Sequence, residues 1–195
     1  PGKYQDTAVA TNISACKPCT EGTYSDVLSL EDAGDCKGCP KGTFGDSKGL
    51  PSVYSCATCP HGTYQADQGK SLVTDCKGCP EGTFGASPGL VQSSDCTKCA
   101  KGTFGIGKGL ASAYECIGCP LGTYSDVTGV SKATDCESCS GGYFSDTEAA
   151  TECKHCIAGK YQGSSGMSEC TDCPADSYNP DTASQACTNI GTGYY

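Results

Sequence analysis

CKGCPEGTFG, residues Cys76–Gly85, recurs in altered form along the whole chain at a nearly constant spacing. Counted from the first cysteine of each pair, related segments begin at residues 16, 36, 56, 76, 96, 116 and 136, a period of 20 residues. After Cys136 the period shortens to 17, and the next segments begin at Cys153, Cys170 and Cys187. Self-similarity at a fixed period indicates a repeat architecture. The sequence therefore predicts one continuous array, with tandem 20-residue repeats over residues 1–139 and 17-residue repeats over 139–195.

The composition lacks the material for one large hydrophobic core. Only 36% of the 195 residues are hydrophobic, and this share includes 19 cysteines, whereas globular domains have about 45–50%. There is no Trp and one Met. So much cysteine is typical of disulfide scaffolds, which persist in oxidising compartments. We therefore expect a small disulfide-rich fold in an extracellular or secreted, cell-surface protein.

Each repeat has an aromatic residue at the same place, five positions after the second cysteine of its pair. One aromatic side chain cannot fold a unit alone, so the repeats must stack, with contacts almost entirely between neighbours. No segment shows a helical period, and the three to five residues between turns favour short strands. The expected fold is mostly irregular, with short β-hairpins, and elongated into a rod. These aromatics are Tyr24, Phe44, Tyr64, Phe84, Phe104, Tyr124, Phe144, Tyr161 and Tyr178, and Tyr4 and Tyr195 share the register.

Glycine lies two positions before the aromatic in every repeat except one, where Asp176 stands. We expect a positive φ or a close backbone approach there, and Asp is one of the few residues that tolerates the left-handed region. A second glycine in the 20-residue loops, at Gly49, Gly69, Gly89, Gly109 and Gly129, predicts a further turn followed by an apolar residue. Lys70 departs from this apolar pattern, and Leu72 is the expected substitute.

Two disulfide schemes respect the repeat. In one, pairing is consecutive, and Cys16 bonds to a cysteine expected two residues upstream of Pro1, because the chain starts in mid-repeat. In the other, pairs interlock across repeats, as in Cys16 with Cys36. This scheme imposes a 40-residue repeat, and the aromatic residues do not alternate with that period. Sequence alone leaves both schemes open. The consecutive bonds are Cys19 with Cys36, Cys39 with Cys56, Cys59 with Cys76, Cys79 with Cys96, Cys99 with Cys116, Cys119 with Cys136, Cys139 with Cys153, Cys156 with Cys170 and Cys173 with Cys187.

The string Cys-Pro-x-Gly-Thr-Tyr/Phe, followed by a turn and another Cys-x-x-Cys pair, occurs at Cys39–Phe44, Cys59–Tyr64, Cys79–Phe84 and Cys119–Tyr124. It resembles the ephrin-receptor-like cysteine-rich repeat, a relative of the first loop module of tumour-necrosis-factor-receptor ectodomains. The resemblance covers essentially the whole chain and implies an extracellular, elongated module with consecutive disulfides. The chain departs from the receptor pattern because one loop type repeats without interruption, and because Ile190 replaces an expected second cysteine.

Other binding chemistries have weaker signals. The Cys-x-x-Cys pairs have the spacing of four-cysteine zinc sites, which keeps a zinc-binding array as an alternative. Aspartates recur after the aromatics and before the cysteines, but no repeat gathers three carboxylates as a calcium loop would, so we expect them to cap turns. The recurring residues are Asp26, Asp46, Asp126 and Asp146 after the aromatics, and Asp35, Asp75, Asp95 and Asp135 before the cysteines.

The remaining features bear on location and partners. A net charge of -9 disfavours nucleic-acid binding. No apolar run is long enough to span a membrane. Asn12 begins a glycosylation sequon, which makes glycans a possible attachment.

No catalytic constellation stands out, so we expect a non-enzymatic protein without a cofactor and, apart from the zinc alternative, without a metal site. The uniform array predicts a structural role, as a stalk or rod-like subunit of a cell-surface or flagellar filament similar to a mastigoneme hair. Its partners would be copies of itself or other filament subunits. The alternative is a ligand-binding receptor or adhesin ectodomain, for which Tyr54 and Tyr114 are the candidate exposed aromatics.

Overall fold

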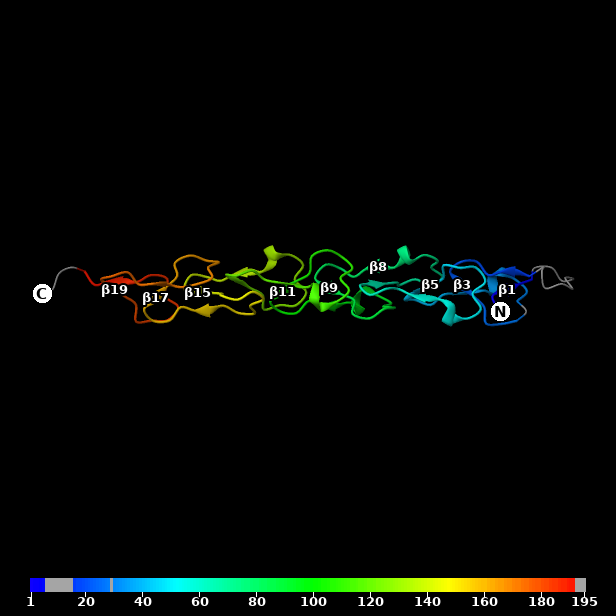
Figure 1. Cartoon of the computed structure of the whole chain (residues 1–195), viewed down its shortest axis with the longest axis horizontal. Coiled ribbons are helices and arrows are strands. Elements are labelled where there is room, and N and C mark those ends of the chain that lie inside the picture. The colour runs from blue at the N-terminus through cyan, green and yellow to red at the C-terminus, as the bar shows by residue number, and fades with distance from the viewer. Residues whose placement is uncertain (6–15, 29, 192–195) are drawn as a thin grey trace. The chain divides into compact units, whose positions relative to one another are not determined.

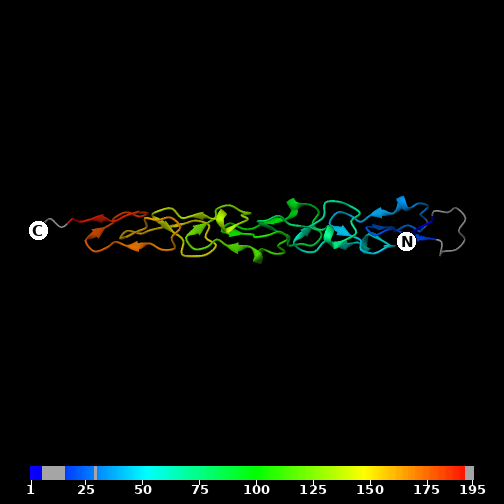
Figure 2. The same ribbon diagram turned by 90° about the horizontal axis from the view of Figure 1, so that it is seen from above.

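A computed structural model of the chain describes residues 1–5, 16–28 and 30–191. Contacts divide the chain into two units, which are described separately. The first comprises Pro1–Thr97 and Lys108–Ser112, and the second comprises Lys98–Gly107 and the residues from Ala113 on. Figures 1 and 2 show the hairpins following one another in chain order within each unit. The described residues contain no α-helix, only short strands and three-residue 3-10 helices.

Every strand is two residues long, shorter than the three to five residues expected from the sequence. In the first unit, β1 (Lys3–Tyr4) pairs with β2 (Lys17–Pro18), β3 (Thr23–Tyr24) with β4 (Lys37–Gly38), β5 (Thr43–Phe44) with β6 (Ala57–Thr58), and β7 (Thr63–Tyr64) with β8 (Lys77–Gly78), all antiparallel. β9 (Thr83–Phe84) and β10 (Thr97–Lys98) follow at the same spacing.

The second unit continues the pattern. β11 (Thr103–Phe104) pairs with β12 (Ile117–Gly118), β13 (Thr123–Tyr124) with β14 (Glu137–Ser138), β15 (Tyr143–Phe144) with β16 (Lys154–His155), β17 (Lys160–Tyr161) with β18 (Thr171–Asp172), and β19 (Ser177–Tyr178) with β20 (Thr188–Asn189). Each hairpin therefore joins the aromatic of one repeat to the Cys-x-x-Cys segment that follows it. The disulfide-rich, tandem-repeat fold expected from the sequence is confirmed.

A 3-10 helix precedes the closing cysteine of the 20-residue loops. Its backbone is held because the cysteine N–H donates to the first carbonyl of the turn, as Cys56 does to Val53 at 3.1 Å. These helices are η2 (Ala33–Asp35), η3 (Val53–Ser55), η4 (Val73–Asp75), η5 (Ser93–Asp95), η6 (Ala113–Glu115) and η7 (Ala133–Asp135).

A sharp turn brings each repeat into its hairpin. In the turn before β5, the Thr43 N–H and hydroxyl both donate to the Pro40 carbonyl, at 3.1 and 2.7 Å. Gly42, the third residue of the turn, has φ +78°, which only glycine adopts without strain. Asp176 takes the same position with φ +61°, so the expected left-handed conformation is confirmed there.

The core is divided into small clusters that each span two repeats. Leu50 packs with the Cys39–Cys56 disulfide, and Tyr24 of the preceding repeat packs against this cluster. In the second unit, Phe104 packs in the same way with Val130 and the Cys119–Cys136 disulfide. Because these aromatics complete the core of the next repeat, a single repeat has no complete core of its own.

Backbone hydrogen bonds join each repeat to the next. The Gly22 N–H donates to the Gly45 carbonyl at 2.7 Å, and the Cys39 N–H donates back to the Gly22 carbonyl at 2.8 Å. One loop further, the Gly49 N–H reaches the Cys19 carbonyl at 2.8 Å. The same set recurs in both units, so a single pattern of main-chain bonds holds consecutive repeats together.

The expectation of contacts almost entirely between neighbours is incomplete. A Cβ on Gly22 would overlap with the carbonyl of Gly69, two loops further along the chain, and a Cβ on Gly62 would overlap with that of Gly109. In the second unit Gly122 has the same relation to Gly166. Each repeat is therefore packed against the next repeat and against the one after it.

The residue after each aromatic from Tyr24 on is buried, and in the 20-residue loops it is small where the second turn is followed by Leu or Val. Beside Gly45, the space for a side chain is taken by Leu50, whose Cδ1 lies 2.8 Å from where a Cβ would be. In the loop with Lys70, the residue after the aromatic is Gln65, which is fully buried. Leu72 is 54% exposed, so the expectation that it substitutes for an apolar residue at position 70 is wrong.

Candidate functional site

The described cysteines form a ladder of nine disulfides in the consecutive order. Their Cα atoms lie 5.7–5.9 Å apart, within the usual range for an unstrained bridge. Cysteines bonded in this way carry no thiolate for zinc. The bonds are Cys19–Cys36, Cys39–Cys56, Cys59–Cys76, Cys79–Cys96, Cys99–Cys116, Cys119–Cys136, Cys139–Cys153, Cys156–Cys170 and Cys173–Cys187.

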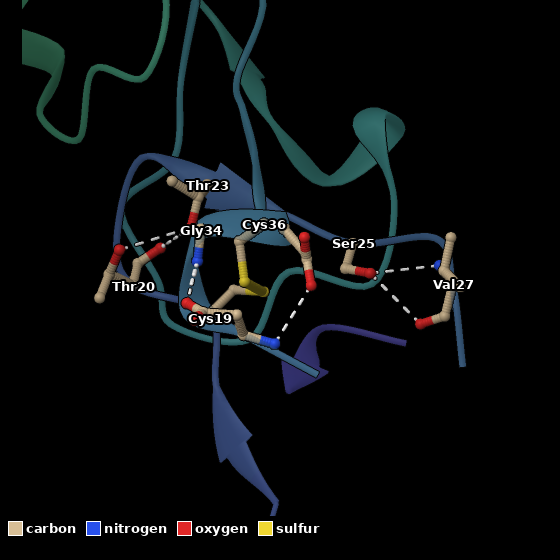
Figure 3. Close-up of a disulfide and its surroundings, with 9 residues drawn as sticks. Cys19, Thr20, Thr23, Ser25, Val27, Gly34 and Cys36 are labelled. Carbon is tan, nitrogen blue, oxygen red and sulfur yellow. Dashed lines mark hydrogen bonds between the residues drawn. A yellow bond between two sulfur atoms is a disulfide. The ribbon is translucent and has the colours of Figure 1, made fainter. Parts of the chain in front are cut away.

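Figure 3 shows how short-range hydrogen bonds surround the first of these disulfides. The Ser25 hydroxyl donates to the Val27 carbonyl and accepts from the Val27 N–H, both at 3.2 Å. The Gly34 N–H donates to Asp32 Oδ1 at 2.9 Å. These contacts satisfy polar groups within the loop, and among the described residues no buried side-chain nitrogen or oxygen lacks a partner.

Cys16 has no disulfide among the described residues. It is half-buried, and its thiol faces Gln5 Oε1 at 4.0 Å. The β1–β2 hairpin beside it has the register of the other hairpins. Its bond to an upstream cysteine stays a prediction. Asn12, the sequon residue, lies outside the described residues.

The recurring aspartates divide into two groups. Those before the cysteines cap the 3-10 turns, since Asp75 Oδ2 accepts the Leu72 N–H at 2.9 Å and Asp35 Oδ2 accepts the Asp32 N–H at 3.1 Å. The expected capping role is confirmed at these positions. In the described part of the chain, no three His, Cys, Asp or Glu side chains come together in a way that would hold a metal ion.

Two aspartates after the aromatics form ion pairs with lysines across the hairpin. Asp26 lies 3.1 Å from Lys37 Nζ, and Asp146 lies 2.6 Å from Lys154 Nζ. In each pair, the hydrogen bond from the lysine lowers the carboxyl pKa below its ordinary value. At the corresponding position of β14, Glu137 accepts a 2.8 Å hydrogen bond from Tyr124 Oη, and this bond raises the pKa of Tyr124. These groups are exposed, so they affect the surface charge more than the stability of the fold.

Two tyrosines protrude from the 3-10 turns. Tyr54 in η3 is 95% exposed and Tyr114 in η6 is 99% exposed. The sequence indicated them as exposed aromatics, and the structure places them so. They lie in separate repeats.

A different aromatic pair lies in the β15–β16 hairpin, where Tyr143 stands opposite His155. Neither residue of this pair was expected as a site from the sequence. The signal was the replacement of the usual threonine by tyrosine at position 143.

Among the described residues, no helix is long and apolar enough to cross a membrane. A family model described as tyrosine-protein kinase ephrin type A/B receptor-like matches four segments of the chain, residues 2–56, 51–96, 107–156 and 142–189. No curated protein matches the sequence. Each matched segment contains two complete disulfide loops.

Proposed function

The chain belongs to the ephrin-receptor-like family, and we propose that it is a non-enzymatic structural protein, a rod-like subunit or stalk of a cell-surface or flagellar filament. The family and the nine disulfides indicate an extracellular or secreted domain, because such bonds persist in oxidising surroundings. The filament, its partners and its resemblance to a mastigoneme hair belong to the proposal.

The observation that carries this proposal is the repetition of one bonding pattern from repeat to repeat. In the first unit, Gly22, Gly42 and Gly62 each donate to the residue after the next aromatic, at 2.7–2.9 Å. In the second unit, Gly102, Gly122 and Gly142 do the same at 2.7–2.9 Å. A chain whose repeats are joined by the same bonds presents equivalent repeats along its length, which suits lateral packing against identical copies.

Covalent closure supports the same role. Each disulfide loop contributes about 3 kcal/mol by restricting the unfolded chain. The second cysteines of the pairs from Cys19 to Cys156 are fully buried. Buried disulfides resist reduction and hold each loop closed, which suits a protein under mechanical load or exposed to proteases.

Electron microscopy with an antibody against the chain tests the proposal on the cells that produce it. Label at regular intervals along extracellular filaments is the expected result. Label spread over the cell body with none on filaments would overturn it. Sedimentation of the purified, oxidised chain gives a second measurement, because a filament subunit associates with itself as its concentration rises.

One observation favours the receptor or adhesin alternative. Tyr54 and Tyr114 expose aromatic rings of the type enriched at protein interfaces. The alternative predicts a stoichiometric complex with one partner molecule, which Tyr54→Thr or Tyr114→Thr would weaken. A chain that binds no partner in crosslinking experiments on intact cells, and associates only with itself, would exclude it.

A further inference from the structure

The middle residue of the 3-10 turn shows a contrast within this one chain. In four of the six turns it is small, as Gly34, Thr74, Ser94 or Thr134. In η3 and η6 it is tyrosine, and these are the rings with 95% and 99% exposure. The turn forms equally well with either type of residue. Folding therefore does not require these two aromatic rings.

The backbone beside each of the two tyrosines is held by a hydrogen bond and by a neighbouring disulfide. The Ser55 N–H donates to Ser52 at 3.0 Å, and Cys56, the next residue, is bonded to Cys39. Under Tyr114, the Cys116 N–H donates to Ala113 at 3.2 Å, and Cys116 is bonded to Cys99. A tyrosine presented in this way loses little conformational entropy when it meets a partner. At 95% and 99% exposure, the two tyrosine side chains are open to solvent, rings and hydroxyls included.

The rest of the composition leaves few competing targets for an oxidant. The chain has no Trp and one Met, and 18 of its 19 cysteines are in disulfides. Free thiols and thioethers are oxidised readily, whereas cysteines already in disulfides are not available as thiols. Most other described tyrosines are at least half-buried in the hairpins, such as Tyr24 and Tyr64. The remaining sulfur targets are Met167, which is 40% exposed, and the half-buried Cys16. Among the described phenols, Tyr54 and Tyr114 are the most accessible to an oxidant at the surface.

We propose that Tyr54 and Tyr114 are modification sites, at which oxidative coupling of phenols links neighbouring copies of this chain. The co-reactants are hydrogen peroxide and an enzyme of the peroxidase class. Each of two tyrosines loses one electron and one proton, and a carbon–carbon bond forms between the ring carbons next to the hydroxyls. Peroxide accepts the two electrons and two protons and becomes two molecules of water. The inference rests on the proposed function, because a filament places copies of the chain side by side.

Two coupling sites in one chain give a sharp test with purified, oxidised protein, peroxidase and peroxide. A chain with two sites links into a series of oligomers, whereas a chain with one site stops at the dimer. Wild type is expected to give a ladder on a reducing gel together with dityrosine fluorescence. Tyr54→Thr and Tyr114→Thr are each expected to give dimers, and the double variant is expected to lose the product.

The variants have matched controls in the chain itself. Threonine is the residue of η4 and η7 at this position, so the turn is retained. Tyr64→Phe changes a half-buried hairpin aromatic to the residue present at Phe44 and Phe84, and is expected to leave the ladder intact. An undiminished ladder in the double variant would overturn the proposal. So would linked peptides that map mainly to Tyr143, Tyr178, Tyr194 or Tyr195.

The assay in solution does not depend on finding the filament. Linked peptides containing Tyr54 or Tyr114 in filaments recovered from cells would support the coupling directly. Filaments that carry the antibody label but contain no such peptides would overturn the coupling and leave the structural function standing. Absence of the chain from filaments would instead overturn the structural function.

Discussion

The 20-residue and 17-residue loops build the same hairpin and disulfide, but they differ in what fills them. The shorter loops lack the 3-10 turn, and their disulfides span 14 residues instead of 17. After the second turn, the longer loops have apolar residues such as Leu50 and Val130, which are only 8% and 7% exposed. The shorter loops have Ala150, Met167 and Ser184 at this position. The backbone bond at this position is retained, since Ser145 N–H donates to the Met167 carbonyl at 3.2 Å. The bond pattern is therefore independent of the apolar filling, and the shorter loops depend more on their disulfides.

Removing one disulfide from each kind of loop is the strongest test of this difference. Loop entropy predicts a loss of about 3 kcal/mol in both, with a difference of only about 0.2 kcal/mol between the two lengths. We expect Cys156→Ala with Cys170→Ala to unfold its loop, because Met167 is 40% exposed there. We expect Cys39→Ala with Cys56→Ala to leave a partly folded loop, because Leu50 and Tyr24 still pack together.

Native-state hydrogen exchange measures the loss of structure in each loop separately. The Gly166 amide, which donates to Cys139, is expected to lose its protection, while the Gly49 amide, which donates to Cys19, keeps part of it. Equal loss at both amides would show that apolar filling does not distinguish the loops.

Glycine before the aromatic offers a second comparison. Gly62 has φ +77° and its Cβ position overlaps with the Gly109 carbonyl, whereas Gly159 has φ +82° with no described atom within 4 Å of that position. Gly62→Ala is expected to cost at least about 2 kcal/mol, from backbone strain and displacement of the neighbouring repeat. Gly159→Ala is expected to cost only the strain, about 1 kcal/mol. Free energies of local opening, measured by hydrogen exchange, give the cost of each substitution. Equal costs would contradict packing between alternate repeats.

Ala149 gives a smaller effect of opposite sign. It occupies the second-turn position with φ +58°, where the longer loops have glycine, as at Gly129 with φ +83°. Ala149→Gly is expected to stabilise its loop by about 0.5–1 kcal/mol, because glycine removes the left-handed strain. The control Gly129→Ala is expected to destabilise its loop by a similar amount. Thermal unfolding of the two variants beside wild type measures both shifts, and a destabilised Ala149→Gly would refute the strain argument.

The ion pairs across the hairpins give the smallest effect. Asp26 and Asp146 keep the same lysine contact although the sequence separation falls from 11 to 8 residues. Their pKa values lie below the ordinary 3.8 because the lysine stabilises the charged carboxylate. The pairs therefore stabilise the fold above that pH and lose their contribution as the pH falls through the lowered pKa.

An NMR titration of the two carboxyls tests these assignments. Lys37→Ala and Lys154→Ala are each expected to return the partner pKa towards its ordinary value, with no change in the other pair. A lowered pKa that persists in both variants would show that the lysines are not its cause.

The period and the turn glycines allowed the fold class to be predicted from the sequence, because covalent closure and positive φ are local properties of residue types. The family followed from the same strings, such as Cys79–Phe84. Strand length was overestimated, since the propensity of Thr, Tyr and Phe says nothing of where a disulfide loop ends pairing. The candidate site was found only in part: Tyr54 and Tyr114 were recognised from their place before a cysteine, while the Tyr143–His155 pair needs the hairpin register to appear.

The sequence by itself determined the repeat, its turns and the composition of a disulfide scaffold, because each depends on residues within one 20-residue or 17-residue period. Only the tertiary structure decided which residues fill the space between repeats. Gln65 is fully buried in the loop where Lys70 stands in place of an apolar residue, and Gly22 meets Gly69 across two loops. Such choices depend on volumes and distances between residues far apart in the chain, which no spacing in the sequence records.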